Sequence, residues 1–138
     1  MKKIYLCGPI QFADDAVSWR KKASYKLKKY FEILDPLRRN FRDNEIYSTN
    51  EIVKFDLQDI EDADIVLVNY CKSSIGTSME VREAYNRGKF IVAFTDLKEK
   101  DWSPWMIYHC TRILKDFDKA VAYIKEHWRV EDNENESA

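Results

Sequence analysis

An apolar run at residues 63–69, followed by a short loop and a helix, is the feature that most constrains the fold of this chain. The run reads ADIVLVN and has the continuous hydrophobicity of a strand buried on both faces, which is typical of parallel sheets. A loop of small polar residues, SSIGTS at residues 73–78, separates it from a helical segment that ends at Gly88. We therefore expect a strand, a loop that could receive a ligand and a helix in direct succession.

The same alternation of apolar and helical segments runs through the rest of the chain. Strands are expected at residues 4–7, 31–34, 64–69, 89–94 and 111–114, and helices at 14–30, 48–61, 79–87 and 117–128, with a short helix beginning at Ser103. This alternation predicts a single doubly wound α/β domain with a five-stranded parallel sheet, of the flavodoxin or Rossmann-like kind. We assign residues 1–129 to the domain and expect residues 130–138 to be a disordered acidic tail.

Composition excludes several classes of function. A formal net charge of −1 gives no reason to expect a nucleic-acid polymer as partner. No apolar stretch is long enough for a membrane span, and the N-terminal run is too short for a signal peptide. Three cysteines without a CxxC pair indicate reduced thiols in a cytoplasmic protein. Because no zinc spacing and no GxGxxG, P-loop or GxSxG motif occurs, we expect no metal or cofactor, and a small molecule as ligand.

Glu80 is the carboxylate that follows this loop, and it has two interpretations. With a hydroxyl residue three positions earlier, it fits a capping box in the first turn of the helix. Alternatively it is a functional carboxylate, because ligands of open α/β sheets bind at the carboxyl ends of the strands. In that first turn the helix dipole would favour its ionised form.

The carboxylates expected at this edge leave the chemistry open. Two carboxyl groups suit attack at the anomeric carbon of a sugar, but they could equally hold Mg²⁺ for phosphate chemistry. A nucleophilic pair of a cysteine with His109 or His127 is a further alternative.

Three segments resemble the signatures of the nucleoside 2-deoxyribosyltransferase family. They are IYLCGPI at residues 4–10, DLQDIEDAD at residues 56–64 and GTSME at residues 76–80, and they occur in the family's order. The similarity is nearest to the 2'-deoxynucleoside 5'-phosphate N-hydrolase branch. It implies an enzyme without a cofactor that acts on a small nucleotide or nucleoside, as a homodimer with shared active sites.

The resemblance also implies roles for particular residues. Glu80 matches the nucleophile that attacks C1', Tyr5 the hydroxyl that orients it, and Asp56 a carboxylate near the sugar and base that could protonate the leaving base. The remaining positions are assigned to substrate binding: Gly8, Ile10, Asp64, Ser74, Gly76 and Ser103. For Asp64, a structural hydrogen bond at the start of a strand is an equal alternative.

One of these positions separates the branches of the family. Transferases that act on free nucleosides carry an acid six residues before the nucleophile, whereas this chain has Ser74, as the nucleotide hydrolases do. A hydroxyl accepts a phosphate that a carboxylate would repel. Ser103 resembles a serine that reaches the phosphate site of the neighbouring subunit.

The arginine-bearing loop of the hydrolases is missing from the chain. QFAD at residues 11–14 stands in its place, so Arg20, Arg38 or Arg39 could supply the phosphate contact instead, unless they are plain surface charge.

The resemblance thus implies an N-glycosidase that cleaves the base–sugar bond of a (deoxy)nucleoside 5'-monophosphate through a glutamyl-glycosyl intermediate. The alternatives are a 2-deoxyribosyltransferase that exchanges bases on free deoxynucleosides, a non-catalytic nucleotide-binding domain and a Mg²⁺-dependent phosphohydrolase.

Overall fold

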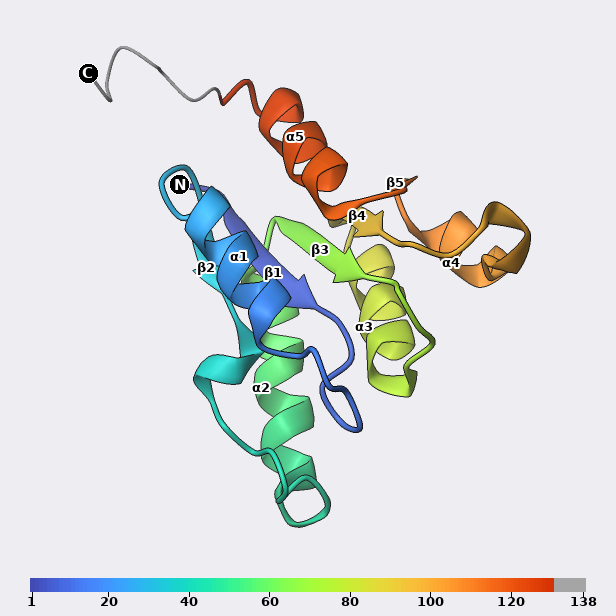
Figure 1. Ribbon diagram of the computed structural model, residues 1–138. Coiled ribbons are helices and arrows are strands. Elements are labelled where there is room, and N and C mark those ends of the chain that lie inside the picture. The colour runs from blue at the N-terminus through green and yellow to red at the C-terminus, as the bar shows by residue number, and fades with distance from the viewer. Residues whose placement is uncertain (131–138) are drawn as a thin grey trace.

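Five parallel strands form one sheet in the order β2-β1-β3-β4-β5 (Figure 1). The strands are β1 (Lys3–Cys7), β2 (Glu32–Leu34), β3 (Ile65–Asn69), β4 (Phe90–Phe94) and β5 (Arg112–Leu114). This computed structural model describes residues 1–130, so the acidic tail expected from the sequence lies almost wholly outside the described residues. The doubly wound α/β fold with a five-stranded parallel sheet is confirmed.

Helices cover both faces of the sheet. On one face lie α1 (Ser18–Leu27) and α5 (Phe117–His127), and on the other lie α2 (Thr49–Asp62), α3 (Ile75–Asn86) and α4 (Pro104–His109). Three short 3-10 turns, η1 (Pro36–Arg38), η2 (Ile46–Ser48) and η3 (Glu99–Asp101), occur in the connections. No helix in the described part of the chain is both long and apolar enough to cross a membrane.

Alternation along β1 directs its side chains to the two faces. Ile4 and Leu6 join the apolar cluster beneath α1 and α5, whereas Tyr5 and Cys7 join the cluster beneath α2 and α3. Successive side chains of a strand point to opposite faces, so this register places the hydroxyl of Tyr5 on the same face as α3.

Several helix boundaries differ from those expected. Helix α3 begins at Ile75 instead of residue 79, because Ser74 caps it. Helix α1 begins at Ser18 instead of residue 14, and the Ser18 hydroxyl bonds to the carboxylate of Asp15 just before it. The segment expected to be a long loop, residues 37–48, contains η1 and η2.

The strand order creates a crevice beside β1. The connection from β1 to β2 passes through α1 on one face, and the connection from β2 to β3 passes through α2 on the other face. At such a switch point the loops leaving neighbouring strands separate, and ligands bind there. In this protein the switch point lies at the carboxyl ends of β1 and β3.

Candidate active site

A cavity of about 600 Å³ lies at the switch point. Four segments line it: the loop after β1, the connection from η1 to η2, the first half of α2, and the start of α3. Of the residues assigned to substrate binding from the sequence, Gly8, Ile10, Ser74 and Gly76 line the cavity, and so do the carboxylates of Asp56 and Glu80.

Gly8 is required for the loop after β1 to approach its neighbours. A Cβ atom at this position would lie 2.8 Å from Cζ2 of Trp19 and 3.0 Å from Cβ of Asn69. Such contacts are shorter than van der Waals packing allows, so only glycine lets this loop turn into the cavity.

Glu80 lies in the second turn of α3, six positions after the capping residue. Ser74 Oγ accepts a hydrogen bond from the backbone N–H of Thr77 at 3.4 Å, and the third helical position of the capping box is therefore Thr77. The expectation that Glu80 caps the first turn is wrong. Its Oε2 atom is buried and has no hydrogen-bond partner among residues 1–130, so this oxygen lacks the partner that a buried carboxyl oxygen usually has.

The electrostatic setting of Glu80 opposes its ionisation. Burial, followed by the charge of Asp56, raises its pKa from 4.5 to about 8, although hydrogen bonding from Tyr5 and the charge of Arg20 lower the pKa. The expectation of a dipole-favoured carboxylate therefore fails, because desolvation and the charge of Asp56 outweigh any effect of the helix dipole.

Tyr5 approaches Glu80 from beneath the cavity. Its side chain is 1% exposed, and burial, then the charge of Glu80, raises the pKa of its hydroxyl well above 10. The hydroxyl therefore stays protonated and can donate to the Glu80 carboxylate, as expected for a group that orients it.

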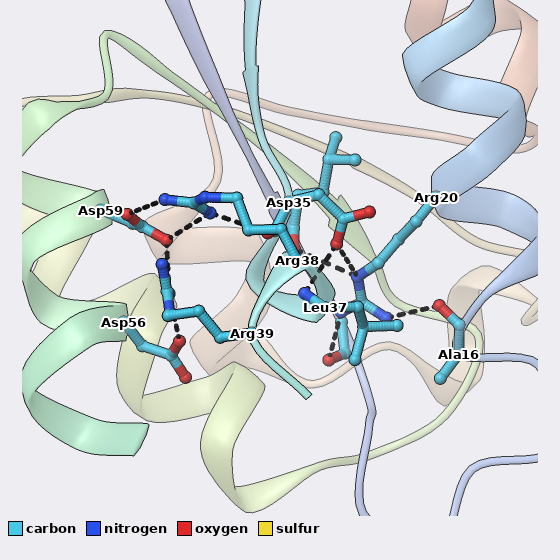
Figure 2. A network of polar contacts seen from close by, with 10 residues as sticks. Ala16, Arg20, Asp35, Leu37, Arg38, Arg39, Asp56 and Asp59 are labelled. Atoms are coloured by element: carbon cyan, nitrogen blue, oxygen red, sulfur yellow. Dashed lines mark hydrogen bonds and ion pairs between the residues drawn. The ribbon is translucent and has the colours of Figure 1, made fainter. Parts of the chain in front are cut away.

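Asp56 belongs to a network of carboxylates and arginines between α2 and η1 (Figure 2). Arg39 Nη2 donates to Asp56 Oδ1 at 3.2 Å and to Asp59 Oδ2 at 2.7 Å. Arg38 binds Asp59 with both terminal nitrogens, at 2.9 and 2.6 Å. Burial raises the pKa of Asp56, and its hydrogen bond to Arg39 offsets part of this rise.

Arg20 is buried on the other side of β1 and does not line the cavity. It donates to the backbone carbonyls of Ala16 at 2.8 Å and Gly8 at 2.9 Å, and its Nε lies 3.9 Å from the carboxylate of Asp35. Through these contacts Arg20 holds the loop after β1 in position. With Arg38 and Arg39 bound to carboxylates, the three arginines expected to replace the missing loop arginine all have other partners.

Two of the predicted binding residues lie away from the cavity. Asp64 precedes β3 at the amino edge of the sheet, and its Oδ2 accepts a hydrogen bond from the backbone N–H of Lys3 at 2.9 Å. Ser103 caps α4 by accepting from Trp105 N at 3.2 Å. The structure gives Asp64 a structural contact and leaves the expected role of Ser103 toward a second subunit a prediction.

Several cavity residues were not expected from the sequence, among them Arg42, Lys72 and Thr77. Arg42 and Lys72 line the cavity from opposite connections, and Thr77 lines it with a buried hydroxyl that has no partner among residues 1–130. Arg42 belongs to a segment expected to be an irregular loop, and only its position in a long polar connection could have indicated a role.

The other chemical alternatives gain no support from the described residues. No group of three or more histidine, cysteine or acidic side chains in residues 1–130 could hold a metal ion. His109 interacts with Arg82 and with the carbonyl of Trp105, whereas the Cys7 thiol donates to the carbonyl of Thr77. No hydrogen bond between a cysteine and a histidine occurs within this range.

Comparison with known proteins assigns the chain to a family. The family model described as nucleoside 2-deoxyribosyltransferase matches residues 4–136, which is nearly the whole chain. The chain belongs to the nucleoside 2-deoxyribosyltransferase family. Enzymes of this family act on small nucleosides or nucleotides and transfer or hydrolyse their glycosyl groups. A search of curated proteins gave no significant match.

Solved structures share the family fold. A 2-deoxyribosyltransferase from Bacillus psychrosaccharolyticus is similar with a TM-score of 0.72 and 21% identity, over 88% of this chain and 91% of that one. The CMP N-glycosidase of Clostridium botulinum is similar with a TM-score of 0.58 and 18% identity, over 91% and 98%. A conserved protein from Enterococcus faecalis V583 has a TM-score of 0.68 and 14% identity, over 92% and 99%.

Proposed function

We propose that this family member is an N-glycosidase that cleaves the base–sugar bond of a (deoxy)nucleoside 5'-monophosphate. The observation that supports it best is the Glu80 carboxyl group, which lines the cavity with one oxygen buried and unpartnered beside Tyr5 and Asp56. A desolvated carboxylate is a stronger nucleophile than a hydrated one, and its negative charge stabilises an oxocarbenium-like transition state.

The reaction then has two steps. In the first, an oxygen of ionised Glu80 forms a bond to C1' as the bond from C1' to the base nitrogen breaks. The electron pair of that bond stays on the base, which takes a proton from Asp56, whose pKa is raised by burial. In the second step, water attacks C1', gives its proton to Asp56 and releases Glu80. Tyr5 orients the Glu80 carboxylate throughout.

The start of α3 favours a substrate that carries a phosphate. Ser73 and Ser74 line the cavity there, and the first backbone N–H groups of a helix attract anions. The acid that would oppose a phosphate is absent, because the residue six positions before Glu80 is Ser74. A serine at this position is better suited to a nucleotide than to a free nucleoside.

A panel of nucleosides and their 5'-monophosphates, assayed for free base by chromatography, tests the activity. We expect base release from a monophosphate in water, and no exchange when a second base is added. Base exchange on the free deoxynucleoside would identify the protein as a 2-deoxyribosyltransferase, the activity that names the family.

Substitution of Glu80 separates the enzyme from a non-catalytic binding domain. Glu80→Gln should retain nucleotide binding and lose base release by at least about a thousandfold, since the loss of a nucleophile removes several kcal/mol of transition-state stabilisation. Glu83→Gln, one turn further along α3 and paired with Arg87, is the matched control. Wild-type turnover by Glu80→Gln would disprove the assignment.

We also propose that the protein is a homodimer with shared sites. Helices α3 and α4 expose an aromatic cluster in which the Tyr85 and Tyr108 rings lie 5.4 Å apart and Trp105 stacks on His109. Large exposed apolar patches mark interaction surfaces, and Ser103 lies at the start of the same α4. Light scattering coupled to size-exclusion chromatography should give twice the chain mass of 16.5 kDa, and a monomer at all concentrations would contradict this.

A further inference from the structure

We infer that Arg42 and Lys72 are the cations that bind the phosphate of the substrate, one from each side of the cavity. Arg42 belongs to the connection between η1 and η2, and Lys72 to the loop between β3 and α3. This inference rests on the proposed function, and it names the residues that replace the arginine missing from the loop after β1.

Both side chains have neutral partners that a phosphate could replace. Arg42 Nη2 donates to the carbonyl of Ala13 at 3.1 Å, and Lys72 Nζ donates to the carbonyl of Phe12 at 3.1 Å. No carboxylate in residues 1–130 forms an ion pair with either of them. Hydrogen bonds from a cation to phosphate oxygens are stronger than those to a neutral carbonyl, so both side chains gain by exchanging partners.

The other basic residues near the cavity are already neutralised. Arg39 lines it but binds both Asp56 and Asp59, and Arg38 binds Asp59. Arg20 is enclosed and holds backbone carbonyls. Moving any of these three to a phosphate would leave a buried carboxylate or carbonyl without its partner, which is costly.

Charged side chains of both signs line the cavity. Lys72 and Ser73 come just before α3, and the Glu80 carboxylate lies near the first turn of α3, where a Cβ atom at Gly76 would be 3.9 Å from Glu80 Oε1. Asp56 lies beside Glu80. Glu45 is the remaining carboxylate of the cavity wall, on the same connection as Arg42. A monophosphate would place its anion between Arg42 and Lys72 and its C1' toward Glu80.

Thr77 adds a second, independent observation at this place. Its side chain is 3% exposed and lines the cavity, and its Oγ1 has no hydrogen-bond partner among residues 1–130. A buried hydroxyl without a partner is unfavourable, and a substrate oxygen close to the start of α3 would satisfy it.

Isothermal titration calorimetry with the full chain tests the inference. The probes are the 5'-monophosphates of the common bases, the matching nucleosides and inorganic phosphate, and the variants are Arg42→Met, Lys72→Met and the double substitution. Each single substitution should raise the Kd of the monophosphate about tenfold or more, as charged hydrogen bonds require. The Kd of the nucleoside should change little, so the ratio of nucleoside Kd to monophosphate Kd should be smaller in the variants than in wild type. Near-wild-type thermal melting confirms that the variants fold.

Arg112→Met on β5 and Lys98→Met near η3 are matched controls, since neither residue lines the cavity. If Arg42→Met and Lys72→Met leave the Kd ratio at the control value, or if wild type binds no monophosphate, the inference is overturned. Base release by wild type with no dependence on these residues would sustain the proposed function and refute the inference. If binding of the monophosphate depends on Arg42 and Lys72 but no base is released, the inference would be supported and the proposed function refuted.

Discussion

Asp56 on α2 and Glu80 on α3 approach the same cavity, and the charge of Asp56 opposes the ionisation of Glu80. Burial is the larger cause, and together the two effects raise the pKa of Glu80 to about 8. Asp56 keeps a directly bonded cationic partner in Arg39, whereas the charge of Glu80 is favoured by Tyr5, Arg20 and Cys7. Asp56 therefore ionises before Glu80.

The first prediction concerns the pH dependence of base release. If ionised Glu80 is the nucleophile and protonated Asp56 is the acid, the pair must hold one proton. kcat/KM should then pass through a maximum and fall as the pH rises above about 8, where both groups are ionised. Initial rates of base release from pH 5 to pH 10 measure this profile. A rate that instead rises and stays level above pH 8 would mean that no protonated Asp56 is needed, and its role as the acid would have to be dropped.

The variant Asp56→Asn provides the control for this assignment. It removes the charge that raises the pKa of Glu80 and frees the cationic Arg39 nearby. Both effects should lower the pKa of Glu80, so the remaining activity should rise with pH to a plateau that is reached below pH 8 and should not fall again. Remaining activity that still falls above pH 8 would show that the fall belongs to another group.

The second prediction concerns stability. Because the folded-state pKa of Glu80 is above its ordinary value of 4.5, the native state holds a proton that the unfolded state loses. This contribution is complete below pH 4.5 and is lost as the pH rises to about 8, which corresponds to about 5 kcal/mol at most. Glu80→Gln should therefore stabilise the protein by several kcal/mol at pH 9 and much less at pH 5. Urea unfolding at the two pH values measures the difference.

Glu126→Gln on α5 is the control for this experiment. Glu126 is exposed, so its substitution should change the free energy of unfolding by less than about 0.5 kcal/mol at either pH. An effect of Glu80→Gln that does not depend on pH would argue against a raised pKa in the folded protein.

The sequence predicts the sheet and the principal carboxylates because both depend on local patterns. Apolar runs such as residues 65–68 identify the strands, and the alternation of elements leads to the edge where Glu80 and Asp56 meet. The start of α3 was missed because its first turn is made of small polar residues that also suit a loop. Asp64 was assigned to binding by resemblance, although its place before a strand puts it at the opposite edge of the sheet.

Other features depend on contacts between distant segments and have no local pattern. The pKa of Glu80 follows from how β1, α2 and α3 enclose it. Arg42 and Lys72 belong to two different connections, and their side chains donate to the backbone carbonyls of residues 13 and 12. These contacts exist only because the fold brings the three segments together. Arg20 donates its hydrogen bonds to backbone carbonyls, and Arg39 binds two carboxylates. Neither set of contacts could be inferred from the spacing of residues in the sequence.

The third prediction compares two neighbouring arginines. Arg39 contacts the carboxylates of both Asp56 and Asp59, whereas Arg38 contacts the carboxylate of Asp59 and the backbone carbonyl of Asp35. Arg39→Gln leaves the half-buried Asp56 without its cation, so the pKa of Asp56 should rise and its position should loosen. We expect kcat/KM for base release at pH 7 to fall about tenfold more in Arg39→Gln than in Arg38→Gln.

Arg38→Gln serves as the matched control, because it removes an arginine from the same network without touching Asp56. Thermal melting should show that both variants lose some stability, since each removes a partner of Asp59. Equal losses of activity in the two variants would mean that the network acts through general stability alone, with no particular role for the contact of Arg39 with Asp56.

The fourth prediction compares two glycines of the cavity wall. Gly8→Ala forces a Cβ to within 2.8 Å of Trp19 and 3.0 Å of Asn69, which only a shift of the loop or of α1 could relieve. Overpacking of this kind costs about 1–3 kcal/mol. At Gly76 a Cβ meets only Glu80 Oε1, at 3.9 Å, and alanine favours the helix by up to about 1 kcal/mol. Urea unfolding should therefore show Gly8→Ala destabilised and Gly76→Ala at least as stable as wild type. If Gly8→Ala were as stable as wild type, the close approach of this loop to α1 could not be a constraint on the site.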